Sequence, residues 1–466
     1  EAGTSAFLSF LSAFIVARIV GPAEVGVGAA VVATHVLLWV VVNALFADAL
    51  VQRLTVDENT ASSAIWASTL VGVAAALLQA GVGVPVAHGI GDGRIMVMSL
   101  VLALPLPLVG AAGAMQGMLT RRRDYRALAG RAVIGQGVGT LIGVSLAFSG
   151  AGAWAIVAQQ LGTSALGALT LLLRAPVRPR LVLHWQPVRE LLHVGLPLVL
   201  STLVQHSRYR LFALLIGGTA GAAALGQVHM AFRLVETVKE IVSTAFWRLS
   251  LPAMSEQQRS LPALHTAISR FLGLTSLVLF PLFGGMLVVI HPLVRLLLGP
   301  LWAPSADAAV VLIVVTMYNF LYLPAGVALV ARGITRFSLF TFLTMTVLTL
   351  AGVLLLRPAT PVAAVWVWAI AQLIVFPPMQ YFTARLLGSS LLVQVRAGLP
   401  ALALTIVAVA CALLIPRAFG EPERALLLML ERLAAGGVVY AAGAAVLLRA
   451  TVLAALQTIG MRGRPA

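Results

Sequence analysis

Long apolar segments recur along the whole chain, separated by short polar turns. Each has about 20 or more residues, which is the length a helix needs to cross a membrane core about 30 Å thick. The pattern therefore predicts an all-α polytopic membrane protein with about fourteen spans. The predicted spans are residues 2–20, 25–50, 61–88, 95–119, 127–149, 152–173, 191–216, 221–248, 263–290, 305–331, 336–356, 361–386, 394–415 and 425–449. The first of them is also compatible with a signal peptide, but it lacks a clear small-residue cleavage site, so we interpret it as a span.

A line of polar residues interrupts the predicted span 221–248. It consists of His229, Arg233, Glu236, Glu240 and Ser243. Successive members are three or four residues apart, so they share one face of a helix, and Lys239 lies beside that face. Each ionised group at the bilayer centre costs about 2.5 to 3.5 kcal/mol, so this face needs partners, water or a ligand. The line of residues is therefore the first candidate for a functional site.

The preceding span adds more polar residues near its middle, namely Gln205, His206, Arg208 and Arg210. Across the two spans the four basic residues exceed the two carboxylates, which leaves a positive surplus. Arginine binds phosphate oxygens through two parallel hydrogen bonds, so a phosphate or pyrophosphate would balance this surplus. The predicted substrate-binding residues are Arg208, Arg210, Arg233, Lys239, Gln205, His206, His229 and Asn43, and the predicted ion-coupling residues are Glu236, Glu240 and Asp48. The alternative is a salt-bridge cluster that only holds the two helices together.

A weak internal repeat appears when the sequence is shifted by 200 residues. The shift places Gly26 on Gly226, Asn43 on Ser243 and Phe46 on Phe246. It suggests two parallel copies of a six-helix unit, with a substrate site between the halves. We therefore predict lobes at 1–175 and 176–390, followed by two further spans and a tail at 391–466. His35, Trp39, Asn43 and Asp48 would then be the counterpart of the polar line in the second half.

The composition agrees with a membrane protein, since 60% of the residues are hydrophobic, 10% are charged and the mean hydropathy is +1.01. The loops are short, which leaves no room for a soluble catalytic domain, so we do not expect an enzyme. The net charge of +16 does not indicate nucleic-acid binding, because the arginines concentrate in alternate loops. This positive-inside asymmetry predicts that both termini are cytoplasmic.

Metal and cofactor chemistry find no support in the sequence. Cys411 is the only cysteine, and the eight histidines show no ligand spacing. We expect no cofactor, although H⁺ or Na⁺ coupling through the carboxylates fits their chemistry. Four glycines in one predicted span, Gly135, Gly137, Gly139 and Gly143, predict close helix packing rather than phosphate binding. Tyr318, Asn319 and Tyr322 suit either sugar contact or a packing seam.

Several short motifs resemble those of bacterial polysaccharide-unit flippases, a polysaccharide transporter family in the MOP (multidrug, oligosaccharidyl-lipid, polysaccharide) superfamily. They are the turn at 17–22 with Gly26, the arginine-containing loop at 122–127, the segments 150–154 and 159–161, and the Leu-Pro-Ala turn at 251–253. The resemblance implies two six-helix lobes in a V-shaped arrangement like that of MATE transporters, plus two C-terminal helices. It also implies movement of an undecaprenyl-pyrophosphate-linked oligosaccharide across the bacterial inner membrane.

In the related lipid II flippases, arginines of the first lobe share the binding of the headgroup. Here that lobe offers Arg18 near one end and Arg53 near the other, with little charge between them. We therefore expect headgroup binding to be biased toward the second lobe.

Several other functions compete with a flippase for this kind of oligosaccharide. A multidrug antiporter of the same fold would need a net-negative cavity for cationic substrates, and a lipid II flippase would share the pyrophosphate site. A polysaccharide polymerase or ligase needs a large outer loop that is lacking, and a non-transporting scaffold is the last alternative. The expected partners are a lipid-linked oligosaccharide, membrane lipids and the polymerase or glycosyltransferases of the same pathway. We expect a monomer.

Overall fold

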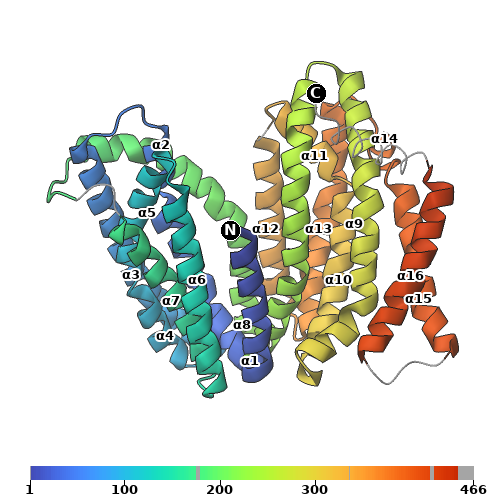
Figure 1. Cartoon of the computed structure of the whole chain (residues 1–466), viewed down its shortest axis with the longest axis horizontal. Coiled ribbons are helices and arrows are strands. Elements are labelled where there is room, and N and C mark those ends of the chain that lie inside the picture. The colour runs from blue at the N-terminus through green and yellow to red at the C-terminus, as the bar shows by residue number, and fades with distance from the viewer. Residues whose placement is uncertain (1, 175–178, 335, 420–424, 450–466) are drawn as a thin grey trace. The chain divides into compact units, whose positions relative to one another are not determined.

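The described residues of the computed structural model are helical and contain no strand (Figure 1). The structure describes residues 2–174, 179–334, 336–419 and 425–449. Its elements are α1 (Ala2–Ala44), α2 (Ala47–Gln52), α3 (Glu58–Ile90), α4 (Arg94–Ala103), α5 (Leu106–Arg121), α6 (Tyr125–Phe148), α7 (Trp154–Leu173), α8 (Trp185–Glu256), α9 (Leu261–Leu297), η1 (Pro300–Trp302), α10 (Ala303–Phe320), α11 (Leu323–Ala331), α12 (Arg336–Leu356), α13 (Pro361–Leu386), α14 (Leu391–Val395), α15 (Leu399–Phe419) and α16 (Ala425–Leu447). The predicted all-α membrane fold is confirmed. The tail after residue 449, with Arg462 and Arg464, lies outside the described residues, as do Arg178 and Arg424 of the predicted loops.

The chain forms two compact units. The first comprises Glu1–His229 and Leu350–Pro361, and the second comprises Met230–Thr349 and Val362–Ala466. The lobe boundaries that we derived from the repeat remain predictions. Within each unit the long helices run side by side as a bundle (Figure 1).

Eleven helical segments of the described chain are long and apolar enough to cross a membrane. Two of them, Ser9–Gln52 and Trp185–Glu256, each contain two predicted spans. At 1.5 Å per residue, the 72 residues of α8 would be far longer than a membrane core about 30 Å thick if the helix were straight. The predicted total of about fourteen spans remains a prediction, because length and composition alone do not show how often each segment crosses.

Sequence signals explain where several helices begin and end. Asp57 caps α3 by accepting a hydrogen bond from the backbone N–H of Thr60, and Asp124 caps α6 in the same way. Each cap satisfies one of the backbone donors that a helix leaves unpaired at its start. At the other end of α3, Gly91 adopts a left-handed φ of 80°, which ends the helix without a side-chain clash.

Two kinks, 200 residues apart, divide α1 and α8. Gly21 has φ 82° and ψ 170°, and Gly221 has φ 85° and ψ 171°, a region of backbone space that only glycine adopts readily. The offset and the matching dihedral angles support the internal repeat. Phe46 and Phe246, another matched pair, are both buried in hydrophobic clusters, each within its own unit.

The helical parts that follow the two kinks pack against each other through glycine inside the first unit. A Cβ on Gly26 would overlap the carbonyl oxygen of Ala222, and a Cβ on Gly226 would overlap that of Pro22. The contact is reciprocal, because each glycine packs against the backbone just after the kink of the other helix. Small residues are what allow two backbones to approach this closely in a membrane.

Glycine also joins α6 to α7, as the sequence predicts. A side chain on Gly135, Gly139 or Gly143 would collide with atoms of α7. Gly137 is the exception, because a Cβ there would meet nothing within 4 Å. The packing prediction is thus confirmed for three of the four glycines and wrong for the fourth, which is out of step with the four-residue spacing of the others.

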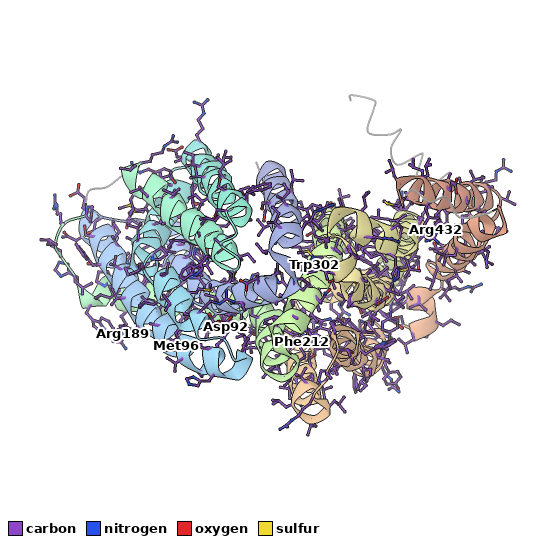
Figure 2. All side chains as sticks on the ribbon, turned by 90° about the horizontal axis from the view of Figure 1, so that it is seen from below. Asp92, Met96, Arg189, Phe212, Trp302 and Arg432 are labelled. Carbon is purple, nitrogen blue, oxygen red and sulfur yellow. The ribbon has the colours of Figure 1, made fainter. Side chains whose placement is uncertain are left out.

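The second unit has its own buried core. Trp302, labelled in Figure 2, is the largest of the fully buried side chains and is 1% exposed. Phe280 and Phe283 on α9 are fully buried as well. Burial of such side chains against neighbouring helices supplies the dispersion contacts that hold helices together where lipid is as apolar as the side chains.

Candidate functional site

The polar line of α8 lies in the second unit, from Arg233 onward. Lys239 Nζ donates to both carboxylate oxygens of Glu236 at 2.8 Å, so these two charges neutralise each other. The side chains are 34% and 41% exposed, which makes this a partly solvated pair. Arg233 is half-buried, and Glu240 is exposed two turns further on. A spacing of three residues within one helix favours this kind of pairing.

The remaining candidates on α8 belong to the first unit. The hydroxyl of Tyr209 and Nδ1 of His229 are 2.9 Å apart, within hydrogen-bond distance. The guanidinium of Arg210 lies over the ring of Tyr209, with its carbon 5.4 Å from the ring centroid. Arg208 is buried, although Gln205 and His206 are exposed. Tyr209 therefore joins two of the predicted residues, a role that the sequence did not reveal.

The predicted site residues divide between the two units. Arg208, Arg210 and His229 lie in the first unit, whereas Arg233, Glu236 and the rest of the polar line lie in the second. Their convergence on one ligand, and their separate roles, remain predictions. Because Lys239 and Glu236 are equal and opposite charges, their pairing leaves the overall positive surplus of α8 unchanged.

Asn43 and Asp48 come from the counterpart segment in the first unit. Asp48 is exposed on the first turn of the short helix α2. Asn43 is buried, and its Oδ1 accepts a hydrogen bond from Arg131 at 3.3 Å. Arg131, on α6, is a residue that sequence reasoning overlooked. It places an arginine well inside the first half of the chain, where we had expected little charge.

Arg131 lines a cavity of about 450 Å³ within the first unit. The cavity lies among α1, α5, α6 and α7, and its polar lining includes Trp39, Asn43, Gln116, Gln136 and Gln160. Three glutamines and an arginine within otherwise apolar spans were a visible signal. Only the tertiary fold brings these four helices to one cavity, which explains why the sequence did not indicate it.

The aromatic residues of α10 form a packing seam. The rings of Tyr318 and Tyr322 meet edge to face at 5.3 Å, and Tyr318 also meets Phe376 at 6.2 Å. Asn319 Nδ2 donates to Gln372 Oε1 at 2.7 Å. These contacts favour the packing interpretation over sugar contact.

Two of the sequence motifs meet at Glu24. Its carboxylate accepts hydrogen bonds from the backbone N–H of Ala153 at 2.6 Å and from Arg94 at 2.8 Å. Gly152 precedes Ala153 with a φ of 59°, and a Cβ there would collide with Glu24. Arg94 also donates to Asp92 in the loop between α3 and α4, and this bond lowers the pKa of Asp92. The motifs thus share one structural role, which is to fix a turn against α1.

Comparison with known proteins adds a family and two relatives. The polysaccharide biosynthesis protein family matches residues 15–307. The succinoglycan biosynthesis transport protein ExoT of Rhizobium meliloti (strain 1021) is 25% identical over 297 residues, which are 64% of this chain and 60% of ExoT. The teichuronic acid biosynthesis protein TuaB of Bacillus subtilis (strain 168) is 23% identical over 343 residues, 72% of this chain and 70% of TuaB. The match thus spans less than two thirds of ExoT.

Two solved structures share the fold. The lipid II flippase MurJ in its inward closed conformation superposes with a TM-score of 0.78 at 11% identity, covering 97% of this chain and 98% of MurJ. An inward-facing multidrug resistance MATE family transporter of the MOP superfamily gives a TM-score of 0.58 at 16% identity, covering 83% of this chain and 96% of the transporter. At these identities the likeness shows the fold alone. With its helical membrane fold and a family match over more than half its length, the chain belongs to the polysaccharide biosynthesis protein family.

Proposed function

We propose that this protein is a flippase that moves an undecaprenyl-pyrophosphate-linked oligosaccharide across the bacterial inner membrane by alternating access. The observation that carries the proposal is the surplus of positive charge on α8, a helix that is otherwise apolar and long enough to span the membrane. Membership of a polysaccharide biosynthesis family supports it, as does the similarity to ExoT, a succinoglycan biosynthesis transport protein.

The pyrophosphate is the part of the substrate that would bind α8. Arg208, Arg210 and Arg233 carry guanidinium groups that suit bidentate contacts with phosphate oxygens. Lys239 would also bind the pyrophosphate, after its ion pair with Glu236 breaks. Gln205, His206, His229 and Asn43 supply hydrogen-bonding groups for the phosphates or the first sugars.

The lipid tail would remain in the membrane during transport. A chain of about 55 carbons cannot enter a polar cavity without a large loss of apolar contact, whereas sugars lose little by moving from water to polar side chains. Glu236, Glu240 and Asp48 would couple transport to H⁺ or Na⁺. The protein would act as a monomer with cytoplasmic termini, beside the polymerase and glycosyltransferases of its pathway. A multidrug antiporter would place cationic substrates against this positive surplus, which disfavours that function.

The test is a flipping assay in a strain that lacks its own flippase. Arg233→Ala removes a charged phosphate contact worth about 1.5 to 3 kcal/mol, so transport at limiting substrate falls about tenfold to a hundredfold. Arg248→Ala is the matched control, because Arg248 is exposed on the same helix and carries the same charge. Full activity in Arg233→Ala, with normal protein level, removes the pyrophosphate role.

Ion coupling is tested separately in the same strain. Glu236→Gln abolishes the dependence of flipping on the proton or sodium gradient if this carboxylate carries the ion. Exchanging the pair, Glu236→Lys with Lys239→Glu, restores the salt bridge but moves the carboxylate. Recovery of activity in the exchanged pair would assign a structural role to Glu236 and refute coupling through it.

A further inference from the structure

The cavity among α1, α5, α6 and α7 has the size of a small-molecule site. Its volume of about 450 Å³ falls within the usual range of about 300 to 1,000 Å³ for ligand pockets. All of its lining residues belong to the first unit, and none of them comes from α8.

Arg131 is the only charged residue among those that line the cavity. Its Nη1 donates to Oε1 of Gln116 and its Nη2 to Oδ1 of Asn43, both neutral amide oxygens. Its guanidinium carbon lies 5.7 Å from the centroid of the Trp39 ring. These contacts orient the side chain firmly without neutralising it.

A positive charge in this position is costly unless an anion accompanies it. A guanidinium carries five N–H donors, of which two are used in the bonds to Gln116 and Asn43. The remaining donors suit a bidentate contact with a carboxylate or a phosphate. Low dielectric surroundings make such a contact stronger than it would be at an exposed surface.

The rest of the polar lining suits a hydroxyl-rich ligand. Gln136 and Gln160 stand on α6 and α7, and their amides both donate and accept hydrogen bonds. Gln136 donates to Thr140 at 3.2 Å, and Gln160 donates to Ser164 at 3.3 Å. These bonds to hydroxyl groups within the same helix are replaceable by the hydroxyls of a sugar.

We propose that this cavity is an anion-binding subsite, in which Arg131 holds a carboxylate or phosphate group of the transported saccharide. The identity of the anion's carrier rests on the proposed function, whereas the binding of an anion at Arg131 does not. The subsite would let the first unit select saccharides that carry a negative charge.

The experiment measures ligand binding to the purified protein in detergent, with no transport step. Glucuronate, inorganic pyrophosphate and uncharged glucose are titrated while binding is followed by saturation-transfer NMR. In Arg131→Met, the affinity for the anion falls about tenfold to a hundredfold, as expected for a charge-assisted pair of hydrogen bonds. Arg131→Lys keeps the charge and retains part of the affinity.

Two controls separate this site from its surroundings. Arg126→Met removes the same charge from the same helix at an exposed position, and leaves binding unchanged. Gln136→Leu weakens binding of glucuronate without changing the charge, which keeps the test decisive if Arg131→Met unfolds. Glucuronate carries no pyrophosphate, so its titration reports on the Arg131 subsite and not on the pyrophosphate site proposed on α8, and failure of the flippase proposal is distinguished from failure of this one.

Each outcome assigns or removes the subsite. Loss of glucuronate binding in Arg131→Met identifies a carboxylated sugar as the ligand, and selective loss of pyrophosphate binding identifies a phosphate instead. Equal affinity of wild type and Arg131→Met for both anions overturns the proposal. Binding of glucose as tightly as glucuronate overturns it as well.

Discussion

The reciprocal glycine contact between α1 and α8 predicts a large effect from the smallest substitution. In Gly26→Ala, the new methyl group would overlap the carbonyl oxygen of Ala222 and lie 3.0 Å from the backbone nitrogen of Gly226. All of these atoms belong to the backbone, so no side chain can rotate away to relieve the clash. The two helices must therefore separate.

The expected cost follows from the geometry. Overpacking of a well-packed contact costs about 1 to 3 kcal/mol, and a clash with rigid backbone belongs at the upper end of that range. Against it stands the gain of about 0.5 to 1 kcal/mol that alanine brings over glycine inside a helix. Gly26→Ala should therefore destabilise the protein by about 1 to 2 kcal/mol net.

Thermal unfolding of the purified protein in detergent measures this effect. Gly137→Ala is the matched control, because a Cβ at Gly137 meets nothing within 4 Å and that glycine is also inside a helix. The control should raise Tm slightly, whereas Gly26→Ala and Gly226→Ala should both lower it. A Gly26→Ala variant as stable as wild type, or a control equally damaged, would refute the reasoning.

Two further predictions concern polar contacts. Arg94 lowers the pKa of Asp92 (labelled in Figure 2). The ion pair between them therefore stabilises the fold above the unfolded pKa of about 3.9, and this stabilisation is lost as the pH falls through the lower pKa of Asp92 in the folded protein. The Tm difference between wild type and Arg94→Ala should thus shrink below about pH 4, and a constant difference would contradict it. Asn319→Leu leaves the buried Gln372 carbonyl without its donor and should lower the free energy of unfolding by about 1 to 3 kcal/mol. Asn319→Asp, with Gln372 unchanged, should lower it by at least as much.

Much of the fold could be predicted because hydropathy is a local property of the chain. The predicted spans 336–356 and 361–386 coincide with α12 and α13, and the predicted span 95–119 corresponds to α4 and α5 together. The break between those two helices falls at Leu104 and Pro105, where proline removes a backbone donor. The predicted breaks after residue 20 and before residue 221 are found at Gly21 and Gly221, whose non-helical dihedral angles divide α1 and α8.

The candidate site was predictable only in part. The pairing of Glu236 with Lys239 follows from their spacing on one helix. The links from Arg131 to Gln116 and Asn43 join residues on three different helices, so no periodicity in the sequence indicates them. Residues that meet across helices are related by packing alone.

The sequence by itself determined that this chain is a helical membrane protein with a positively charged helix, because span length, hydropathy and the spacing of charges are properties of contiguous residues. Only the tertiary structure decided where polar residues from distant helices gather. Glycine contacts set how closely α6 and α7 approach, and the cavity around Arg131 is lined by these two helices together with α1 and α5. Such distances depend on the packing of the whole unit, which no single segment of sequence contains.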